Sequence, residues 1–428
     1  MVVISLGTNL GNRLNNLKKA VSLMSEHCLY NVKQSIVLET VAIVPEGAPE
    51  DWNKPYLNMI VCGDTKLSPQ ELLRSLKSIE RKMGRPEVYE KWSPRIIDLD
   101  ILFYDDMVVR ESNLIIPHPE LKNRRFFQHI LSLMGIGSYE YDPSLNESFT
   151  NTFTLSPQMV GVVNVTRDSF SDGGRFYDID KAVAQVNHLG NIGASIVEIG
   201  VQSTRPGAQL QSPDEEYEKL NRVLEAFGSA VFENQFLSID VLHASTAIRL
   251  LQKYPIYLIN SITGDFDDDT LKVIANKQCK YCVVHSLTVP ANSIIISDDD
   301  PMPCILEWGR GVIDHLLDLG FSSDNIILDP GIGFGKNPYQ NIRILQHLGD
   351  LRSLNCQIMV GHSRKSFIGS FSMASAAERD VETIAISQAI ADKIDFLRVH
   401  NVRDHMRAMV AQSMLSRSSY CCQVSVEK

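Results

Sequence analysis

Residues 159–174 read MVGVVNVTRDSFSDGG, and this stretch decides the fold of the longer part of the chain. Its first five residues form a short apolar run, typical of a buried strand, which ends at the polar residue Asn164. A polar loop that ends in two glycines follows, and a helix is predicted from about Asp178. The unit is therefore an apolar strand, a polar residue at its end, and a helix.

The same unit recurs along the rest of the chain, and the residues at or after the strand ends differ in chemistry. Helix-length amphipathic segments separate the apolar runs. Eight strand-helix units over about 260 residues are typical of a (β/α)8 barrel, in which functional residues gather at the C-terminal ends of the strands. The seven further runs lie at 195–200, 236–239, 256–259, 281–284, 325–328, 357–360 and 395–397.

Composition predicts a globular enzyme of more than one domain. The chain has 428 residues, of which 44% are hydrophobic and 21% are charged. Its formal net charge of -10 argues against nonspecific nucleic-acid binding, which needs a basic surface. No apolar run is long enough to cross a membrane, and the N-terminal run is too short for a signal peptide. We therefore expect a cytoplasmic protein that binds small molecules.

Residues 1–140 alternate strands and helices without the barrel repeat, which predicts an α+β domain with a ferredoxin-like antiparallel sheet. Within this domain, Ser68 followed by Pro69 predicts the N-terminal end of a helix. Residues 141–157 are rich in Ser, Thr, Asn and Pro and are predicted to be a linker. The barrel domain is expected to span residues 158–420.

The chemical centre of the N-terminal domain is KWSPRIIDLDILF, residues 91–103. With a side-chain period of two, Asp98 and Asp100 project from one face of a strand. Two adjacent carboxylates repel each other unless a cation lies between them, and such oxygen ligands suit Mg²⁺. The alternative is a solvent-exposed acidic face on an edge strand, which is the better interpretation of an isolated pair of acids.

Neighbouring residues favour the metal interpretation. The region holds cations that can bind phosphate and flat aromatic rings on which a heterocycle can stack. Acids, cations and aromatics together indicate metal-assisted transfer from a nucleotide. These residues are Arg85, Lys91, Arg95, His118, Arg124 and Arg125, with Tyr56, Trp92 and Phe126.

Four segments of this domain resemble hydroxymethyl-dihydropterin pyrophosphokinase: SLGTNLGNR (5–13), YLN (56–58), WSPRIIDLDILF (92–103) and PHPELKNRRF (117–126). The family transfers a diphosphate from ATP to a pterin alcohol and uses two Mg²⁺ ions. The resemblance implies that Asp98 and Asp100 bind the metals and that Arg85 and Arg95 are catalytic phosphate clamps. It also implies an ATP site with Trp92, His118 and Arg124, and a pterin site with Tyr56, Asn58 and Phe126.

Polar residues at the predicted barrel strand ends indicate a second site. Two acids and three bases among them are too many to attribute to capping, and Arg398 and His400 follow the eighth strand, where barrels often bind anions. The mouth is therefore predicted to bind a phosphorylated substrate and a polar planar one. The residues are Asn164, Asp240, Asn260, Asp329, Lys365, Arg398 and His400.

The barrel resembles dihydropteroate synthase in VGVVNVTRDSFSDGG (160–174), STRPGA (203–208), LDPGIGFGKN (328–337), GHSRKS (361–366) and RVHNV (398–402). That family condenses dihydropterin-methyl diphosphate with p-aminobenzoate. The resemblance implies that Asp240, Asn260, Asp329 and Lys365 bind the pterin, with Lys365 and Asp172 also catalytic. It further implies diphosphate binding by Asn164, Arg398 and His400, with Mg²⁺ on Asn164, and p-aminobenzoate binding by Phe170, Thr204, Arg205, Pro206 and Ser366.

The barrel also departs from the family pattern. Arg167 replaces a usual proline, and Gln202 stands where an acidic residue is common. Glu198 stands where an aspartate is common, and Val241 and Leu242 replace hydroxyl residues. None of these changes removes a predicted pterin or diphosphate contact, so we expect activity with altered substrate affinity.

Together these features predict a bifunctional enzyme of folate biosynthesis, a transferase whose N-terminal domain makes the pterin diphosphate that the barrel consumes. The resemblance implies a homodimer formed through the barrel. Two alternatives stay open. One is a barrel that transfers methyl groups from a pterin, as corrinoid-linked methyltransferases do, and the other is a domain kept only as a noncatalytic scaffold.

Overall fold

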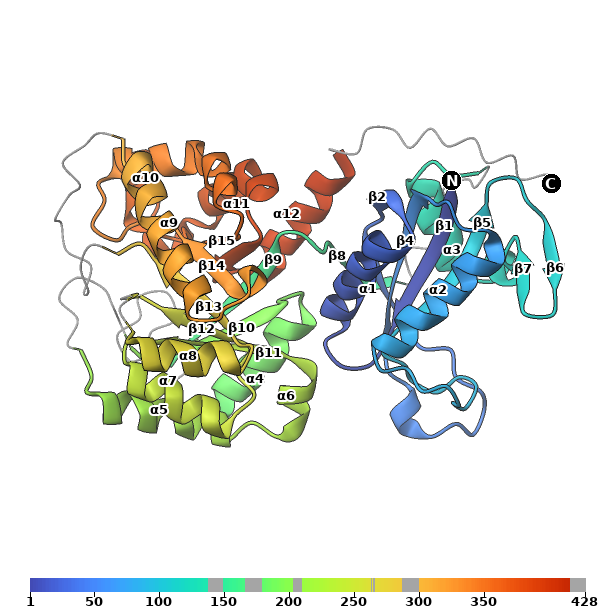
Figure 1. The fold of residues 1–428 in the computed structure, drawn as a ribbon, viewed down its shortest axis with the longest axis horizontal. Helices are drawn as coiled ribbons and strands as arrows, with labels where there is room; N and C mark the ends of the chain where they lie inside the picture. The colour runs from blue at the N-terminus through green and yellow to red at the C-terminus, as the bar shows by residue number, and fades with distance from the viewer. Residues whose placement is uncertain are drawn as a thin grey trace. The chain divides into compact units, whose positions relative to one another are not determined.

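The computed structural model describes residues 1–137, 149–165, 179–202, 210–262, 264, 266–286 and 300–415. The chain forms two compact units (Figure 1). The first comprises Met1–Leu155 and the segment that begins at Met409, and the second comprises Ser156–Ala408.

The N-terminal unit is built on a six-stranded antiparallel sheet. Its main strand order is β5-β1-β4-β3-β8, and β2 pairs with the other end of β4. Strands β1, β3, β4 and β5 with two connecting helices make the split βαβ arrangement of ferredoxin-like domains, as predicted. The strands are β1 (Val2–Thr8), β2 (Tyr30–Gln34), β3 (Val37–Thr40), β4 (Tyr56–Asp64), β5 (Asp98–Tyr104) and β8 (Phe149–Phe153).

Helices cover both faces of this sheet. Helices α1 (Arg13–His27) and α2 (Pro69–Lys82) contact each other and pack on β1 and β5, whereas α3 (Arg125–Leu133) packs against β4 (Figure 1). Ser68 caps α2 through a capping box with Pro69 at the first helical position, as the sequence predicts. A hairpin of β6 (Val109–Glu111) and β7 (Leu114–Ile116) leads to a 3-10 turn at Pro119–Lys122.

Strand β8 lies inside the range 141–157 that the sequence predicts as a linker, and here the structure differs from the prediction. The strand pairs antiparallel with β3, with Phe149 opposite Thr40 and Phe153 opposite Val37. Thr150 and Asn151 hydrogen-bond the buried carboxylate of Glu39 on β3. The segment therefore completes one edge of the N-terminal sheet.

The second unit is a closed barrel of eight parallel strands, which confirms the predicted (β/α)8 fold. The strands follow one another around the barrel in chain order and β16 closes on β9. They are β9 (Gln158–Asn164), β10 (Ile196–Gly200), β11 (Phe236–Val241), β12 (Leu258–Ser261), β13 (Lys280–Val284), β14 (Ile326–Asp329), β15 (Gln357–Val360) and β16 (Phe396–Val399).

Helices surround the barrel strands (Figure 1). These helices are α4 (Ile179–Asn191), α5 (Pro213–Glu225), α6 (Ser229–Asn234), α7 (Ala244–Lys253), α8 (Asp268–Asn276), α9 (Met302–Asp318), α10 (Pro338–Gln346), α11 (Asp380–Ile390) and α12 (Val402–Leu415). A layer of buried side chains from alternate strand positions, including Cys282 and Phe396, fills the barrel interior. The polar strand ends therefore lie at the end of a packed core rather than of an open channel.

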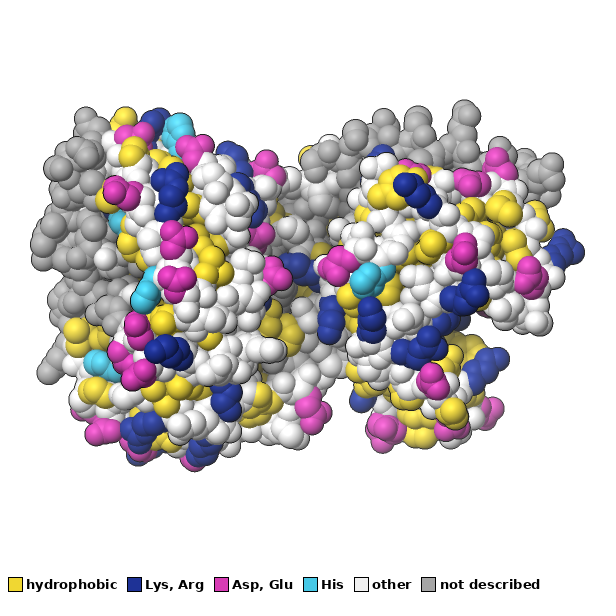
Figure 2. Space-filling view, in the orientation of Figure 1, with side chains coloured by type: hydrophobic (Ala, Val, Ile, Leu, Met, Phe, Trp, Pro, Cys, Tyr) yellow, Lys and Arg dark blue, Asp and Glu magenta, His cyan; other side chains and the backbone are white. Residues whose placement is uncertain are grey.

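The barrel surface mixes charges of both signs. On the face shown in Figure 2, acidic and basic side chains are intermingled over the helices. In the described ranges, no helix has an apolar stretch long enough to span a bilayer.

Candidate active sites

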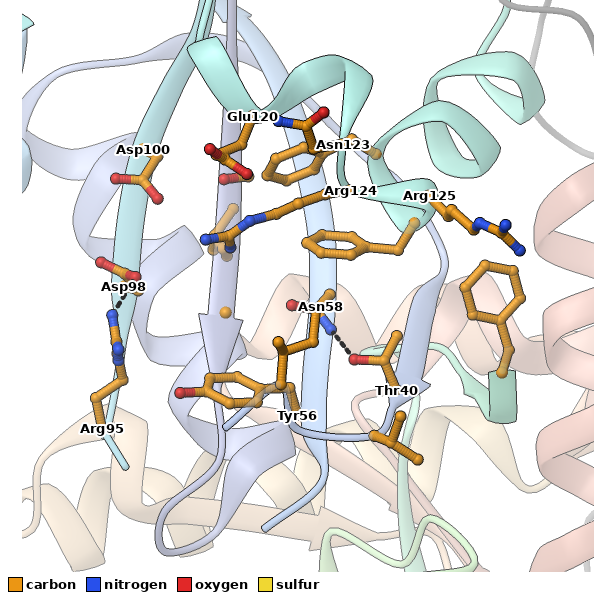
Figure 3. Close-up of a pocket in the computed structure, with 18 of the residues that line it drawn as sticks. Thr40, Tyr56, Asn58, Arg95, Asp98, Asp100, Glu120, Asn123, Arg124 and Arg125 are labelled. Carbon is orange, nitrogen blue, oxygen red and sulfur yellow. Dashed lines mark hydrogen bonds and ion pairs between the residues drawn. The ribbon is translucent and has the colours of Figure 1, made fainter. Parts of the chain in front are cut away.

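The N-terminal unit contains a cavity of about 540 Å³ between the sheet and the turn before α3 (Figure 3). Strands β1, β4 and β5 and the start of α3 all contribute to its walls. The cavity brings together eight of the ten residues that the sequence predicts for this site. These are Tyr56, Asn58, Trp92, Arg95, Asp98, Asp100, Arg124 and Phe126.

Asp98 begins β5, and arginines hold both of its carboxylate oxygens. Arg85 Nη1 donates to Oδ1 at 2.5 Å, and Arg95 Nη1 donates to Oδ2 at 2.7 Å. Burial opposes ionisation of Asp98, but the charges of Arg85, Arg95 and Lys77 outweigh burial and lower its pKa. Asp98 is therefore a carboxylate anion fixed at one end of the cavity.

Asp100 follows on the same face of β5, and its side chain also lines the cavity (Figure 3). Burial and the charge of Asp98 raise the pKa of Asp100, which is the expected behaviour of two adjacent acids. No group of three or more potential His, Cys, Asp or Glu ligands occurs in the part of the chain that the structure describes. Mg²⁺ needs only one or two carboxylates when substrate phosphates complete its ligands, so the two aspartates fit this metal.

Arg85 and His118 do not line the cavity. Arg85 is buried behind Asp98, where its Nη1 also lies 3.0 Å from Glu80 Oε1. Glu80 in turn accepts from Lys77 Nζ at 2.7 Å. The ring of His118 accepts from the backbone N–H of Glu120 at 3.2 Å, and burial lowers the pKa of His118. The structure therefore places both residues next to the acid pair rather than in the cavity wall.

The other end of the cavity is suited to a polar planar ring. Asn58 Nδ2 donates to Thr40 Oγ1 at 2.9 Å, which fixes the orientation of the amide beside Tyr56 (Figure 3). Arg124 reaches across from the turn before α3 toward the two aspartates, whereas Arg125 points away from them (Figure 3). One end of the cavity therefore carries the charged residues Asp98 and Asp100, and the other carries the Tyr56 ring and the Asn58 amide. Arg124 lies between the two ends (Figure 3).

Asn9 is a buried residue of this site that the sequence reasoning did not single out. Its Oδ1 accepts from the backbone N–H of Arg95 at 2.7 Å, and its own N–H donates to the Arg95 carbonyl at 3.1 Å. Its Nδ2 donates to the carbonyl of Lys54 at 3.3 Å. Asn9 thus fixes the backbone of Arg95 against the end of β1, and its place inside the segment 5–13 is the only signal that the sequence offered.

At the barrel mouth, Asn164 and Asp329 end strands β9 and β14, and Asp240 and Asn260 are the next-to-last residues of β11 and β12. The strand register pairs Gly200 with both Asn164 and Asp240, and pairs Asp240 with Asn260, so these residues lie at one level. A Cβ atom at Gly200 would lie 3.2 Å from Asn164 Oδ1. Glycine there leaves room between the two polar side chains.

Arg398 turns toward the acids of the mouth. Its guanidinium lies 2.5 Å from Glu198 Oε1 and 3.0 Å from Asp240 Oδ2. Glu198 is completely buried, and its Oε2 accepts from Ser238 Oγ and Asn260 Nδ2, each at 3.1 Å. Glu198, noted in the sequence only as a departure from a family pattern, is therefore the centre of the network that orients the predicted pterin residues.

Two buried oxygens of this network have no hydrogen-bond partner among the described residues: Asp240 Oδ1 and Asn260 Oδ1. Buried polar atoms are rarely left unpaired in folded proteins. Burial and the charge of Glu198 raise the pKa of Asp240 to about 7. Both observations indicate a site that is completed by a polar ligand.

Lys365 and Asp329 lie on the other side of the mouth. Burial lowers the pKa of Lys365 to about 8, although Asp329 opposes the effect, and the Lys365 ammonium donates to the Ile332 carbonyl. Burial raises the pKa of Asp329, whose Oδ1 accepts from the backbone N–H of Gly331 at 2.8 Å. The two side chains therefore belong to a pair in which each one supports the charge of the other.

The loop after β14 has a conformation that only glycine fits at residue 331. Gly331 has φ +71°, and a Cβ atom would lie 2.0 Å from the carbonyl oxygen of His285. Lys336 closes this loop by donating to the carbonyls of His285, Gly331 and Phe334 at 2.8–3.0 Å. These contacts hold the loop that follows Asp329 against the end of β13.

The remaining predicted barrel residues are less fully described. The distance from His400 Nδ1 to Ser363 Oγ is 2.9 Å. Ser366 is exposed and begins the 3-10 turn Ser366–Ser370. One amide oxygen of Asn164 is available to a metal, which would need phosphate oxygens as its other ligands. Phe170, Asp172, Thr204, Arg205 and Pro206 lie outside the described residues, as does Arg167.

The structure thus has two domains, an α+β domain whose cavity brings two aspartates together with arginines and aromatic rings, and a (β/α)8 barrel with acids and bases near its strand ends. Residues 3–134 match the family described as 7,8-dihydro-6-hydroxymethylpterin-pyrophosphokinase, and residues 160–400 match the family described as pterin binding enzyme. The chain belongs to the bifunctional folate synthesis proteins, transferases that join a pyrophosphokinase domain to a dihydropteroate synthase domain.

Individual relatives match either nearly the whole chain or the barrel domain alone. A folate synthesis bifunctional protein of Chlamydia muridarum is 32% identical over 443 residues, covering 96% of this chain and 97% of that protein. The dihydropteroate synthase of Yersinia pestis, solved with a sulfonamide drug, is 30% identical with a TM-score of 0.57, over 62% of this chain and 96% of that one. A solved HPPK-DHPS protein in complex with substrates covers 97% of this chain and 99% of its own, with 19% identity and a TM-score of 0.53, which supports the fold alone.

Proposed function

We propose that the N-terminal site transfers a diphosphate from ATP to 6-hydroxymethyl-7,8-dihydropterin, and that the barrel condenses the product with p-aminobenzoate to give 7,8-dihydropteroate and pyrophosphate. The observation that carries the first step is the single cavity with Asp98 and Asp100 at one end and Tyr56 and Asn58 at the other. Such a cavity can hold a polyphosphate and a planar alcohol side by side.

In the N-terminal site, Tyr56 and Phe126 are proposed to stack on the pterin, and Asn58, oriented by Thr40, to hydrogen-bond it. Arg95, Arg124 and Trp92 face the cavity and are proposed to bind ATP, together with His118. Arg85 is proposed to support Asp98 from behind and to add positive charge near the transferred phosphates. Fixed cations near the phosphates stabilise the charge that develops during transfer.

Asp98 and Asp100 would hold Mg²⁺ in this site, and the family resemblance implies two ions. The metal would supply Lewis-acid activation of the phosphates and a template for their orientation. The protein's own contribution is to keep the Asp98 carboxylate ionised and aligned by Arg85 and Arg95.

In the barrel, Asp240, Asn260, Asp329 and Lys365 are proposed to bind the pterin through the polar atoms that face the mouth. Asn164, Arg398 and His400 are proposed to hold the departing diphosphate, with Mg²⁺ on Asn164, because they lie at the anion-binding side of the barrel. Arg398 also donates a hydrogen bond to Asp240, so it links the proposed diphosphate-binding residues to the proposed pterin-binding residues. The roles of Asp172 in catalysis and of Phe170, Thr204, Arg205, Pro206 and Ser366 in p-aminobenzoate binding rest on the resemblance.

Two further proposals also rest on resemblance or composition. We propose a homodimer through the barrel domain and a cytoplasmic location. Size-exclusion chromatography with light scattering checks the first, and fractionation of the source cells checks the second.

A product assay tests the proposed function directly. The purified chain receives 6-hydroxymethyl-7,8-dihydropterin, ATP, Mg²⁺ and p-aminobenzoate, with no added pterin diphosphate, and products are resolved by mass. Formation of AMP and dihydropteroate together supports both steps. Methyl transfer from methyl-tetrahydrofolate, or AMP without dihydropteroate from a folded chain, contradicts the proposal for the barrel.

The pKa values at the barrel mouth predict a bell-shaped pH profile. Asp240 must be ionised to accept a hydrogen bond from the pterin, and its pKa is about 7, whereas Lys365 must be protonated to donate one, and its pKa is about 8. We therefore expect kcat/KM for the pterin diphosphate to rise as the pH passes 7 and to fall as it passes 8. Steady-state assays of the barrel reaction from about pH 6 to about pH 9 check this, and a flat profile contradicts it.

A further inference from the structure

Strand β8 brings an aromatic side chain to the N-terminal cavity. Phe149, the first residue of this strand, is half-buried and lines the same cavity as Tyr56 and Asn58. Its backbone pairs with Thr40, the residue whose hydroxyl orients the Asn58 amide. Its ring packs against the ring of His129, with centroids 4.8 Å apart at 47°. Phe149 therefore lies at the end of the cavity proposed to hold the pterin.

The position of β8 is fixed by a buried carboxylate. Glu39 on β3 accepts from Thr150 Oγ1 at 2.9 Å and from Asn151 Nδ2 at 2.5 Å, and it lies 2.8 Å from Arg13 Nη2. Although burial opposes ionisation, these donors lower the pKa of Glu39. The ion thus ties β8 to the sheet through charge-assisted hydrogen bonds, and Phe149 has a defined place rather than that of a loose linker residue.

Sheet topology separates Phe149 from the charged end of the site. Strand β8 is at one edge of the order β5-β1-β4-β3-β8, and Asp98 and Asp100 are on β5 at the opposite edge. A change in Phe149 should therefore act on the bound ring and leave the polyphosphate contacts in place.

We propose that Phe149 is a pterin-binding residue, so that the segment joining the two domains forms part of the first active site. The residue lies beyond the family match at 3–134 and was not among those that the resemblance implied. An aromatic wall beside a planar heterocycle adds apolar contact and favourable ring geometry. The inference rests on the proposed function of this cavity, and its test must separate the two.

The test measures steady-state AMP release by full-chain variants. For Phe149→Ala we expect KM for hydroxymethyl-dihydropterin to rise about five- to tenfold, with KM for ATP changed less than about twofold. Phe149→Leu should recover part of the loss because it restores apolar contact. Thr152→Ala is the matched control, since Thr152 is exposed on the same strand, and it should behave as wild type. Dihydropteroate formation from supplied pterin diphosphate shows that the barrel of each variant is folded, and an unchanged KM for ATP shows that its N-terminal site is intact.

A further variant separates failure of this inference from failure of the proposed site. Asn58→Ala should raise KM for the pterin if the cavity binds it at all. If Asn58→Ala has this effect and Phe149→Ala does not, the inference about Phe149 is wrong while the proposed site stands. If neither variant changes KM for the pterin, the proposed site is wrong as well. Equal changes in both KM values, also seen in Thr152→Ala, would show only a structural role for β8.

Discussion

Replacing Asp98 with Asn is expected to lower AMP release by about 10³-fold, because it removes the cavity carboxylate whose two oxygens are held by Arg85 and Arg95. Asparagine keeps the shape of the side chain but has no charge with which to hold a metal. It also leaves Arg85, whose side chain is only 4% exposed, with Glu80 as its remaining acidic partner. We therefore expect a loss of about 1–3 kcal/mol in the free energy of unfolding as well.

The two effects can be separated because the chain carries a second reaction. Dihydropteroate formation from supplied pterin diphosphate should be unchanged in Asp98→Asn, and thermal unfolding measures the cost to stability. Asp106→Asn changes an exposed acid just after β5 and is the matched control. Retention of more than about one tenth of the wild-type AMP release would contradict the role of Asp98 as a metal ligand.

Replacing Arg398 with Met is expected to destabilise the barrel by about 3–5 kcal/mol and to abolish dihydropteroate formation. The change leaves Glu198, which is completely buried, and Asp240 next to each other without the guanidinium that pairs with both. Burial and the charge of Glu198 already raise the pKa of Asp240 to about 7, and the change removes the Arg398 charge that opposes this shift. For acids with a raised pKa in the folded state, stability falls as the pH rises above the unfolded value of about 4. The deficit should therefore be larger at pH 8 than at pH 5.

Unfolding in denaturant at these two pH values checks the prediction. The double variant Arg398→Met/Glu198→Gln should recover part of the stability, because it removes one of the two unpaired charges. Arg403→Met, an exposed position on α12, is the matched control and should differ little from wild type. A deficit that is the same at both pH values and is unaffected by Glu198→Gln would contradict the electrostatic explanation.

The elements built from local patterns were predictable from the sequence. Most barrel strands are short apolar runs with a polar residue at or next to the end, and the parallel register then places Asn164, Asp240 and Asn260 at one level without any side-chain detail. Alternation along β5 likewise placed Asp98 and Asp100 on one face. In each case one physical rule was enough to predict the position. Side chains alternate between the two faces of a strand, and the C-terminal ends of the strands of a parallel barrel meet at one mouth.

Long-range pairing was not predictable in the same way. Strand β8 reads FTNTF, with three exposed polar residues between two phenylalanines, so it lacks the apolar pattern of a buried strand. Its pairing depends on hydrogen bonds to Glu39, which lies more than 100 residues earlier in the sequence. The sequence places Arg398 at a strand end but does not show that its guanidinium turns to Glu198. That orientation depends on a buried acid in a neighbouring strand, which only the closed barrel brings near.

The edge position of β8 has a consequence for motion. Strand β4 is paired with β1 on one side and with β2 and β3 on the other, whereas β8 is paired only with β3, and three of its five residues are exposed. Local opening costs least where few contacts must break, so β8 should detach from the sheet more often than the central strands do. The wall of the cavity that carries Phe149 is thus expected to open more often than the walls formed by the central strands β1 and β4.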